Sequence, residues 1–121
     1  WRDLLARRPA APRPATVRHA VELLEATPEH PWTVADLARR VGLTTRGLQA
    51  GFARHLGVAP TAHLRRIRLE RAHLDLVAAD PARCSVAEVA HRWGFTHLGR
   101  FGAAYRARYG RPPSHTLRAV R

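Results

Sequence analysis

The sequence predicts an all-α protein of about seven helices, because one helical unit occurs twice along the chain. The first copy spans Thr33–Pro60 and the second spans Ser85–Pro113. In both copies, apolar residues recur at the three- and four-residue intervals of an α-helix. No segment carries a convincing strand signal, so we expect no sheet.

The two copies align with an offset of 52 residues up to Gly42 and Gly94, and of 53 residues after them. One residue has therefore been inserted in a turn of the second copy. Repetition in register indicates a duplicated supersecondary unit.

Each copy opens with the signals of a short helix. A hydroxyl residue lies three positions before an acid, Thr33 before Asp36 and Ser85 before Glu88, which is the capping-box pattern. A glycine follows the apolar residues of each helix, and there the chain must leave the helix in a left-handed conformation.

A second helix should follow in each copy, with Thr44 and Thr96 placed as its N-caps. The buried side of this helix would carry a pair of large apolar residues: Leu48 and Phe52 in one copy, Phe101 and Tyr105 in the other. A capped helix, a glycine turn and a second helix with an apolar face are the parts of a helix-turn-helix.

The remaining segments complete four predicted regions. Residues 1–15 are a proline-spaced linker at the end of a missing N-terminal domain, or the disordered tail of a free-standing protein. A helix capped by Thr16 opens the first subdomain, residues 16–60. Residues 61–80 form a connecting helix, and residues 81–121 form the second subdomain, which ends in a short helix capped by Ser114. The predicted buried stripe of the connecting helix is Leu64, Ile67, Ala72, Leu74, Leu76 and Val77.

Composition indicates a nucleic-acid partner. The chain has 21 basic residues, all of them Arg, against nine acids, and its net charge is +12. Genomic base composition can explain the absence of Lys, but not the excess of positive charge. A domain pI above about 9 is typical of nucleic-acid binders, and here the pI is near 11.8.

Other classes of protein find little support. The single Cys excludes a disulfide framework within one chain and fits a reducing cytoplasm, and no membrane span or signal peptide is predicted. The eight His residues are scattered, so we expect no metal site and no cofactor. No arrangement of side chains indicates an enzyme. A DNA-alkyl acceptor would need a reactive thiol, for which Cys84 is the sole candidate.

Two longer patterns resemble the DNA-binding domain of AraC/XylS-family transcriptional regulators. The first is Leu48-x3-Phe52-x4-Gly57-x2-Pro60-x3-Leu64-x4-Leu69-x2-Ala72. The second is Ser85-Val-Ala-Glu-Val-Ala-x2-Trp-Gly-Phe95, followed by Phe101-x3-Tyr105-x3-Tyr109-Gly110-x-Pro-Pro113. The resemblance covers about Val17–Leu117. It implies a homeodomain-like, AraC-type fold with two helix-turn-helix subdomains joined by a long central helix, and one monomer that binds two adjacent major-groove segments.

The resemblance also assigns base-contacting positions. In the first subdomain, Arg46, Gln49 and Ala50 match the family's base-contacting positions, with Thr45 near the rim of the groove. Arg can bond guanine and Gln can bond adenine in a bidentate manner, whereas Ala can only pack on a thymine methyl.

The second subdomain has fewer polar candidates. His97 and Arg100 are expected to contact bases, and Ala103 stands where many relatives carry a longer polar residue. We therefore expect this subdomain to contribute phosphate contacts and shape more than sequence. The candidates for phosphate contacts are Arg40, Arg54, Arg65, Arg92, Arg106 and Arg108.

These features together predict the DNA-binding part of a bacterial, sequence-specific transcription activator, located in the cytoplasm at the nucleoid. Its expected partners are double-stranded DNA and RNA polymerase, with an effector ligand or dimerisation through the missing N-terminal domain. A non-specific architectural DNA-binding protein is the alternative, suggested by the charge alone.

Overall fold

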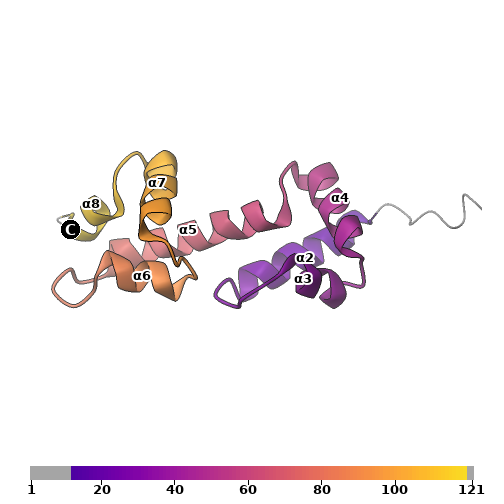
Figure 1. The fold of residues 1–121 in the computed structure, drawn as a ribbon, viewed down its shortest axis with the longest axis horizontal. Helices are drawn as coiled ribbons and strands as arrows, with labels where there is room; N and C mark the ends of the chain where they lie inside the picture. Colours follow the sequence, from indigo (N-terminus) through magenta and orange to yellow (C-terminus); the bar gives the residue numbers. More distant parts are fainter. Residues whose placement is uncertain (1–11, 120–121) are drawn as a thin grey trace, which may run out of the picture. The chain divides into compact units, whose positions relative to one another are not determined.

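The computed structural model describes residues 12–119, which form seven α-helices and no strand (Figure 1). The all-α prediction is confirmed. The helices are α2 (Pro14–Ala26), α3 (Val34–Arg40), α4 (Thr45–Leu56), α5 (Pro60–Ala78), α6 (Val86–Arg92), α7 (Leu98–Tyr109) and α8 (Pro113–Arg118). None of these helices is long and apolar enough to cross a membrane. Most of the predicted linker, residues 1–11, lies outside the described residues.

The described residues divide into two compact units. The first comprises residues 12–27 and 32–64, with α2, α3 and α4; the second comprises residues 28–31 and 65–119, with α6, α7 and α8. Helix α5 begins in the first unit and continues into the second. Each unit thus contains one of the two predicted helix-turn-helix copies.

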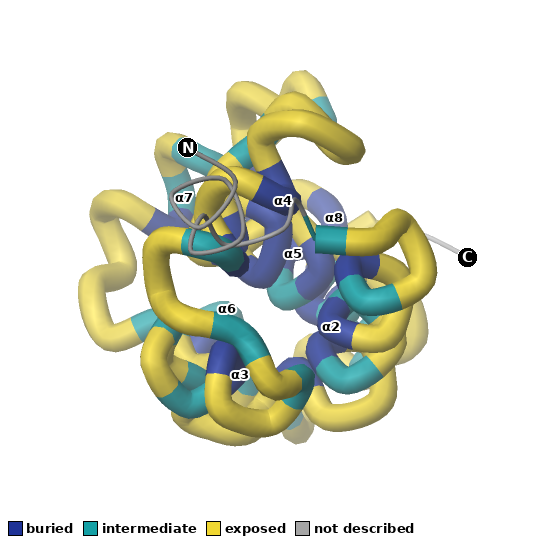
Figure 2. Tube along the Cα trace, turned by 90° about the vertical axis from the view of Figure 1, so that its right-hand side faces the viewer, coloured by how far each residue is buried: buried dark blue, intermediate teal, exposed yellow. Residues whose placement is uncertain are grey.

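The core of the first unit lies where α2, α3 and α4 pack against one another. Each helix contributes apolar side chains at helical spacing, and Figure 2 shows buried stretches alternating with exposed ones along the chain. The fully or nearly fully buried side chains are Val17, Ala20, Leu24, Leu37, Ala38, Leu48 and Phe52. The predicted buried pair of the second helix is therefore confirmed.

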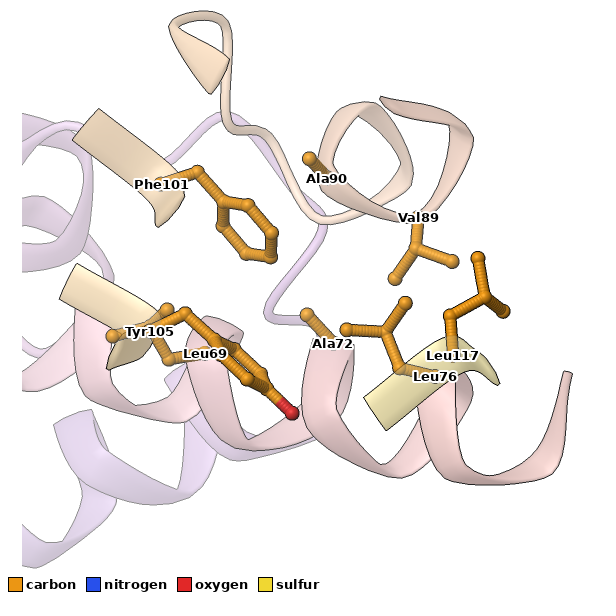
Figure 3. Packing of buried hydrophobic residues seen from close by; sticks show 8 residues of the cluster. All are labelled: Leu69, Ala72, Leu76, Val89, Ala90, Phe101, Tyr105 and Leu117. Carbon is orange, nitrogen blue, oxygen red and sulfur yellow. The ribbon is translucent and has the colours of Figure 1, made fainter. Parts of the chain in front are cut away.

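The core of the second unit gathers side chains from α5, α6, α7 and α8 (Figure 3). Tyr105 is fully buried, and its hydroxyl lies 2.6 Å from Thr116 Oγ1 and 2.7 Å from His73 Nδ1. The His73 ring also stacks on Tyr109 at a centroid distance of 4.1 Å. One phenol thus joins α5, α7 and α8 through hydrogen bonds at the centre of the unit.

The predicted starts and turns of α3 and α6 are present. Thr33 Oγ1 accepts a hydrogen bond from the Asp36 amide at 3.0 Å, and Ser85 Oγ accepts one from the Glu88 amide at 3.1 Å. The turns that follow pass through Gly42 and Gly94, whose φ angles of 74° and 86° lie in the left-handed region. A residue with a Cβ atom would be strained there.

The predicted N-caps of α2 and α8, Thr16 and Ser114, are wrong. Helix α2 begins at Pro14 with Arg13 as N-cap, so Thr16 lies inside the helix. Helix α8 begins at Pro113 with Pro112 as N-cap, and Ser114 lies inside it. In both cases a proline occupies the first helical position, where its fixed φ and missing N–H suit a helix start.

The buried stripe of α5 also differs from its prediction. Leu69, Ala72 and Leu76 are buried, whereas Leu74 is 56% exposed and Val77 is 43% exposed. Leu74 follows Ala72 by two residues, which turns its side chain about 200° around the helix axis at 3.6 residues per turn. The helices packed against α5 select its buried side, and this selection is not encoded in α5 alone.

We predict that Tyr105→Phe lowers the free energy of unfolding by about 1–3 kcal/mol, because the buried Thr116 hydroxyl loses its partner. Burial raises the pKa of Tyr105 above its ordinary value, although the hydrogen bond to Thr116 opposes this. The hydroxyl is thus protonated and able to donate at neutral pH. Urea denaturation measures the change.

Tyr109→Phe is the matched control. The Tyr109 hydroxyl accepts only an exposed hydrogen bond, from Arg108 Nε at 3.2 Å, so its removal should change the stability by less than about 0.5 kcal/mol. Equal losses in the two variants would contradict the central role of Tyr105.

Candidate nucleic-acid interface

Helix α4 is capped at both ends, and its buried residues determine which of its side chains face solvent. Thr44 Oγ1 accepts a hydrogen bond from the Gly47 amide at 3.0 Å, as predicted, and the helix ends at Gly57 in the left-handed conformation. Leu48 and Phe52 are fully buried. The predicted base-contacting residues share the exposed side of the helix: Thr45, Arg46, Gln49 and Ala50.

Gly51 serves packing in the first unit. A Cβ atom added at this buried position would lie 2.9 Å from Val17 Cγ2 and 3.1 Å from Pro12 Cγ. Helix α4 can therefore approach α2 closely only because position 51 lacks a side chain. This close contact holds the exposed side of α4 in place.

Helix α7 has the same length as α4, twelve residues, and ends at Gly110 in the left-handed conformation. Its N-cap is His97, whose Nδ1 accepts a hydrogen bond from the Arg100 amide at 3.0 Å. The prediction of Thr96 as N-cap is wrong. The offset of 53 residues after the turn pairs Thr44 with His97, so the alignment of the two copies already contained this signal.

The predicted base-contacting residues of the second unit are all exposed, but their roles in the fold differ. The His97 ring turns back over the start of α7, within 3.1 Å of where a Cβ of Gly99 would lie. Arg100 and Ala103 lie in the first two turns of the helix. Leu98, which was not predicted as a site residue, is the first residue of the helix and is 45% exposed.

The six predicted phosphate contacts are all exposed. Neighbouring side chains orient three of them, Arg40, Arg108 and Arg92, the last of which is described below. The Arg40 guanidinium lies 5.6 Å from the centroid of the Trp32 ring. Arg108 donates to the Tyr109 hydroxyl and lies over its ring. An arginine held in one direction loses less side-chain entropy when it meets a phosphate. The other three exposed candidates are Arg54, Arg65 and Arg106.

Asp75, which was not predicted as a site residue, joins α5 to the C-terminal end of α6. Its Oδ2 accepts hydrogen bonds from Arg92 Nη1 at 2.9 Å and from Trp93 Nε1 at 2.7 Å. The hydrogen bond to Asp75 raises the pKa of Arg92. Arg92 is therefore part of an ion pair, in which Asp75 offsets its charge.

Arg68 is a second arginine committed to the fold. It is partly buried, and its guanidinium donates to the Pro28 carbonyl at 2.7 Å and the His30 carbonyl at 2.8 Å. Burial lowers the pKa of Arg68, but a guanidinium stays charged at any physiological pH. Arg68 thus fixes the segment 28–31 against α5 within the second unit.

Residues that could bind a metal do not gather in the described part of the chain. Among residues 12–119, no group of three or more His, Cys, Asp and Glu side chains could hold a metal ion. Cys84 is partly buried, and its thiol contacts the neighbouring Ser85 carbonyl.

Two capped helix-turn-helix units with exposed, arginine-rich second helices define a DNA-binding protein of the helix-turn-helix class. Comparison with known families agrees, because a family described as "Helix-turn-helix domain" matches residues 37–119. The solved structure of a probable AraC family transcriptional regulator from Rhodopseudomonas palustris is 36% identical, with a TM-score of 0.78 over 85% of this chain and 94% of that chain. This chain belongs to the AraC/XylS family of helix-turn-helix transcription regulators.

Two curated relatives match most of this chain. The probable thc operon regulatory protein of Rhodococcus erythropolis is 49% identical over 88% of this chain and 32% of that protein. The XylDLEGF operon transcriptional activator 2 of Pseudomonas putida is 33% identical over 80% of this chain and 62% of that protein. The chain therefore spans less than two thirds of the length of either relative.

We predict that substitutions of the neighbouring residues Thr44 and Thr45 have different effects on stability. Thr44→Ala removes the N-cap of α4 and should lower the free energy of unfolding by about 0.5–2 kcal/mol. Thr45→Ala changes an exposed side chain and should alter stability by less than about 0.5 kcal/mol. Thermal or urea unfolding of the two variants measures the difference, and a larger loss for Thr45→Ala would contradict the observed cap.

Proposed function

We propose that this chain is the DNA-binding part of a sequence-specific transcription activator, with α4 and α7 each entering a major-groove segment of one site. The exposed side of α4 is the main support, because it joins two side chains that can each bond one base in a bidentate manner. Arg46 suits guanine N7 and O6, and Gln49 suits adenine N6 and N7. Both extend from a helix whose opposite side is locked in the core.

The exposed arginines would supply affinity that does not depend on sequence. Arg40 and Arg54 are exposed in the first unit, and Arg65, Arg106 and Arg108 are exposed in the second. Such contacts release condensed counterions from DNA, so they make binding strongly dependent on salt. They position the two helices, and base contacts then select the sequence.

The assignment as an activator rests on the relatives. One of them is named an operon regulatory protein and another an operon transcriptional activator. Both extend well beyond the part that matches this chain. We infer that RNA polymerase is a partner, and that effector binding or dimerisation is the task of a further domain.

Selection of bound sites from a random duplex library tests the proposal. At about 150 mM salt the purely electrostatic component is weak enough for base contacts to determine which duplexes are retained. We expect enrichment of one asymmetric site that covers two major-groove segments. If the bound pool is no richer in any sequence than the input pool, binding is architectural and the proposal is wrong.

Arg46→Ala and Arg54→Ala distinguish base contacts from phosphate contacts. Arg46→Ala should weaken binding to the selected site by about 1–3 kcal/mol and relax the preference at one base position. Arg54→Ala should weaken binding to all sequences alike and reduce the salt slope by about one. Titrations at several salt concentrations measure both effects, and equal weakening of all sequences by Arg46→Ala would exclude Arg46 as a base contact.

A further inference from the structure

Helices α4 and α7 can be aligned residue by residue, because the same features fix both. Each has twelve residues, an N-cap side chain that accepts from the third amide of the helix, and a left-handed glycine at its end. Each buries a pair of residues four positions apart, Leu48 and Phe52 in α4 and Phe101 and Tyr105 in α7. A residue of α4 therefore corresponds to the residue 53 positions later in α7.

This alignment shows that α7 lacks polar side chains where α4 carries them. The four exposed base-contacting positions of α4 hold Thr45, Arg46, Gln49 and Ala50, of which Arg46 and Gln49 have long polar side chains. The corresponding residues of α7 are Leu98 for Thr45, Gly99 for Arg46, Gly102 for Gln49 and Ala103 for Ala50. None of these four side chains can donate or accept a hydrogen bond.

The two polar residues predicted to contact bases do not fill this gap. His97 uses its Nδ1 to cap α7, which folds its ring toward Gly99. Arg100 is exposed, but it corresponds to Gly47 of α4, which is not one of the four base-contacting positions. Apart from the His97 ring, which lies over Gly99, the groove-facing side of α7 is thus aliphatic and low. A Cβ added at Gly102 would meet nothing within 4 Å, so no other side chain covers the helix there.

Leu98 is the largest side chain on this side of the helix, and it is 45% exposed. A single exposed leucine is common and needs no explanation. Its position is informative, because Leu98 occupies the first helical position of a DNA-binding helix. Leu98 and Ala103 mark the two edges of its exposed side, about 140° apart around the helix axis. The one apolar feature on the major-groove edge of a base pair is the C5 methyl group of thymine.

We propose that α7 recognises thymine C5 methyl groups through Leu98 and Ala103. This inference rests on the proposed function, and it assigns different chemistry to the two halves of the site: hydrogen bonds to base edges by α4, and burial of methyl groups by α7. The open position at Gly102 allows the helix to come close enough for aliphatic contact. The exposed arginines of the second unit supply the accompanying phosphate contacts.

Replacement of thymine by uracil tests this directly, because it removes only the methyl group and keeps every hydrogen-bonding atom of the base. Each thymine in a selected site is replaced in turn, and binding of the 121-residue chain is measured. The base preference relaxed by Arg46→Ala identifies the half bound by α4. In the other half, we expect at least one replacement to weaken binding about fourfold, the effect of burying one methyl group.

The Leu98→Ala variant should bind the thymine and uracil duplexes equally at that position. Leu74→Ala is the matched control, since Leu74 is also exposed in the second unit but lies on α5; this variant should keep the full sensitivity to the methyl group. Circular dichroism establishes that both variants keep the helical fold.

Each other outcome has a distinct meaning. If uracil has no effect anywhere in the second half while a site is still selected, the inference is wrong and the proposed function stands. If no site is selected at all, the proposed function fails first. If Leu98→Ala leaves DNA binding unchanged but lowers transcription by purified RNA polymerase, Leu98 contacts the polymerase and the inference is wrong.

Discussion

The structure depends on one constraint, which is that the second helix of each helix-turn-helix is held by a buried pair four residues apart. In α4 the pair is Leu48 and Phe52, and in α7 it is Phe101 and Tyr105; none of the four is more than 1% exposed. Residues four apart lie on the same side of a helix. Once this side is buried, the rotation of the helix is fixed, and so is the identity of the residues that can meet DNA.

Local signals explain how much of this could be predicted from the sequence. The caps Thr33, Thr44 and Ser85 act within three residues, and the glycine turns need only one, so all were recognisable in the chain. Signals over longer separations were not recognisable. Asp75 joins Arg92 and Trp93 across 17 and 18 residues, and the exposure of Leu74 reflects which helices pack on α5. For the DNA-contacting residues, the sequence and the fold fix where the side chains lie, while their individual contacts stay predictions.

Positive charge has two separate uses in this protein. Two arginines form hydrogen bonds within the second unit: Arg68 donates to backbone carbonyls, and Arg92 donates to the carboxylate of Asp75. Exposed residues such as Arg54 and Arg106 leave their charge toward solvent. A count of basic residues therefore overstates the positive charge available to bind a phosphate backbone. Only the structure distinguishes arginines that are bonded within the fold from arginines that face solvent. Had each arginine been judged from the sequence alone, Arg92 would have ranked equal to Arg54.

The duplicated unit shows how one framework can support two kinds of recognition. The inward positions of both copies do the same work, with a capped start, a left-handed end and a large buried pair, because the packing of the helix requires them. The outward positions have no such requirement. There, Arg46 and Gln49 of α4 correspond in the alignment to Gly99 and Gly102 of α7. These glycines offer no side-chain hydrogen bond to a base, and they leave less bulk between the helix backbone and a neighbouring surface. A helix of this kind can gain sequence preference from the shape and the methyl groups of the DNA, whereas we propose that α4 gains it from hydrogen bonds.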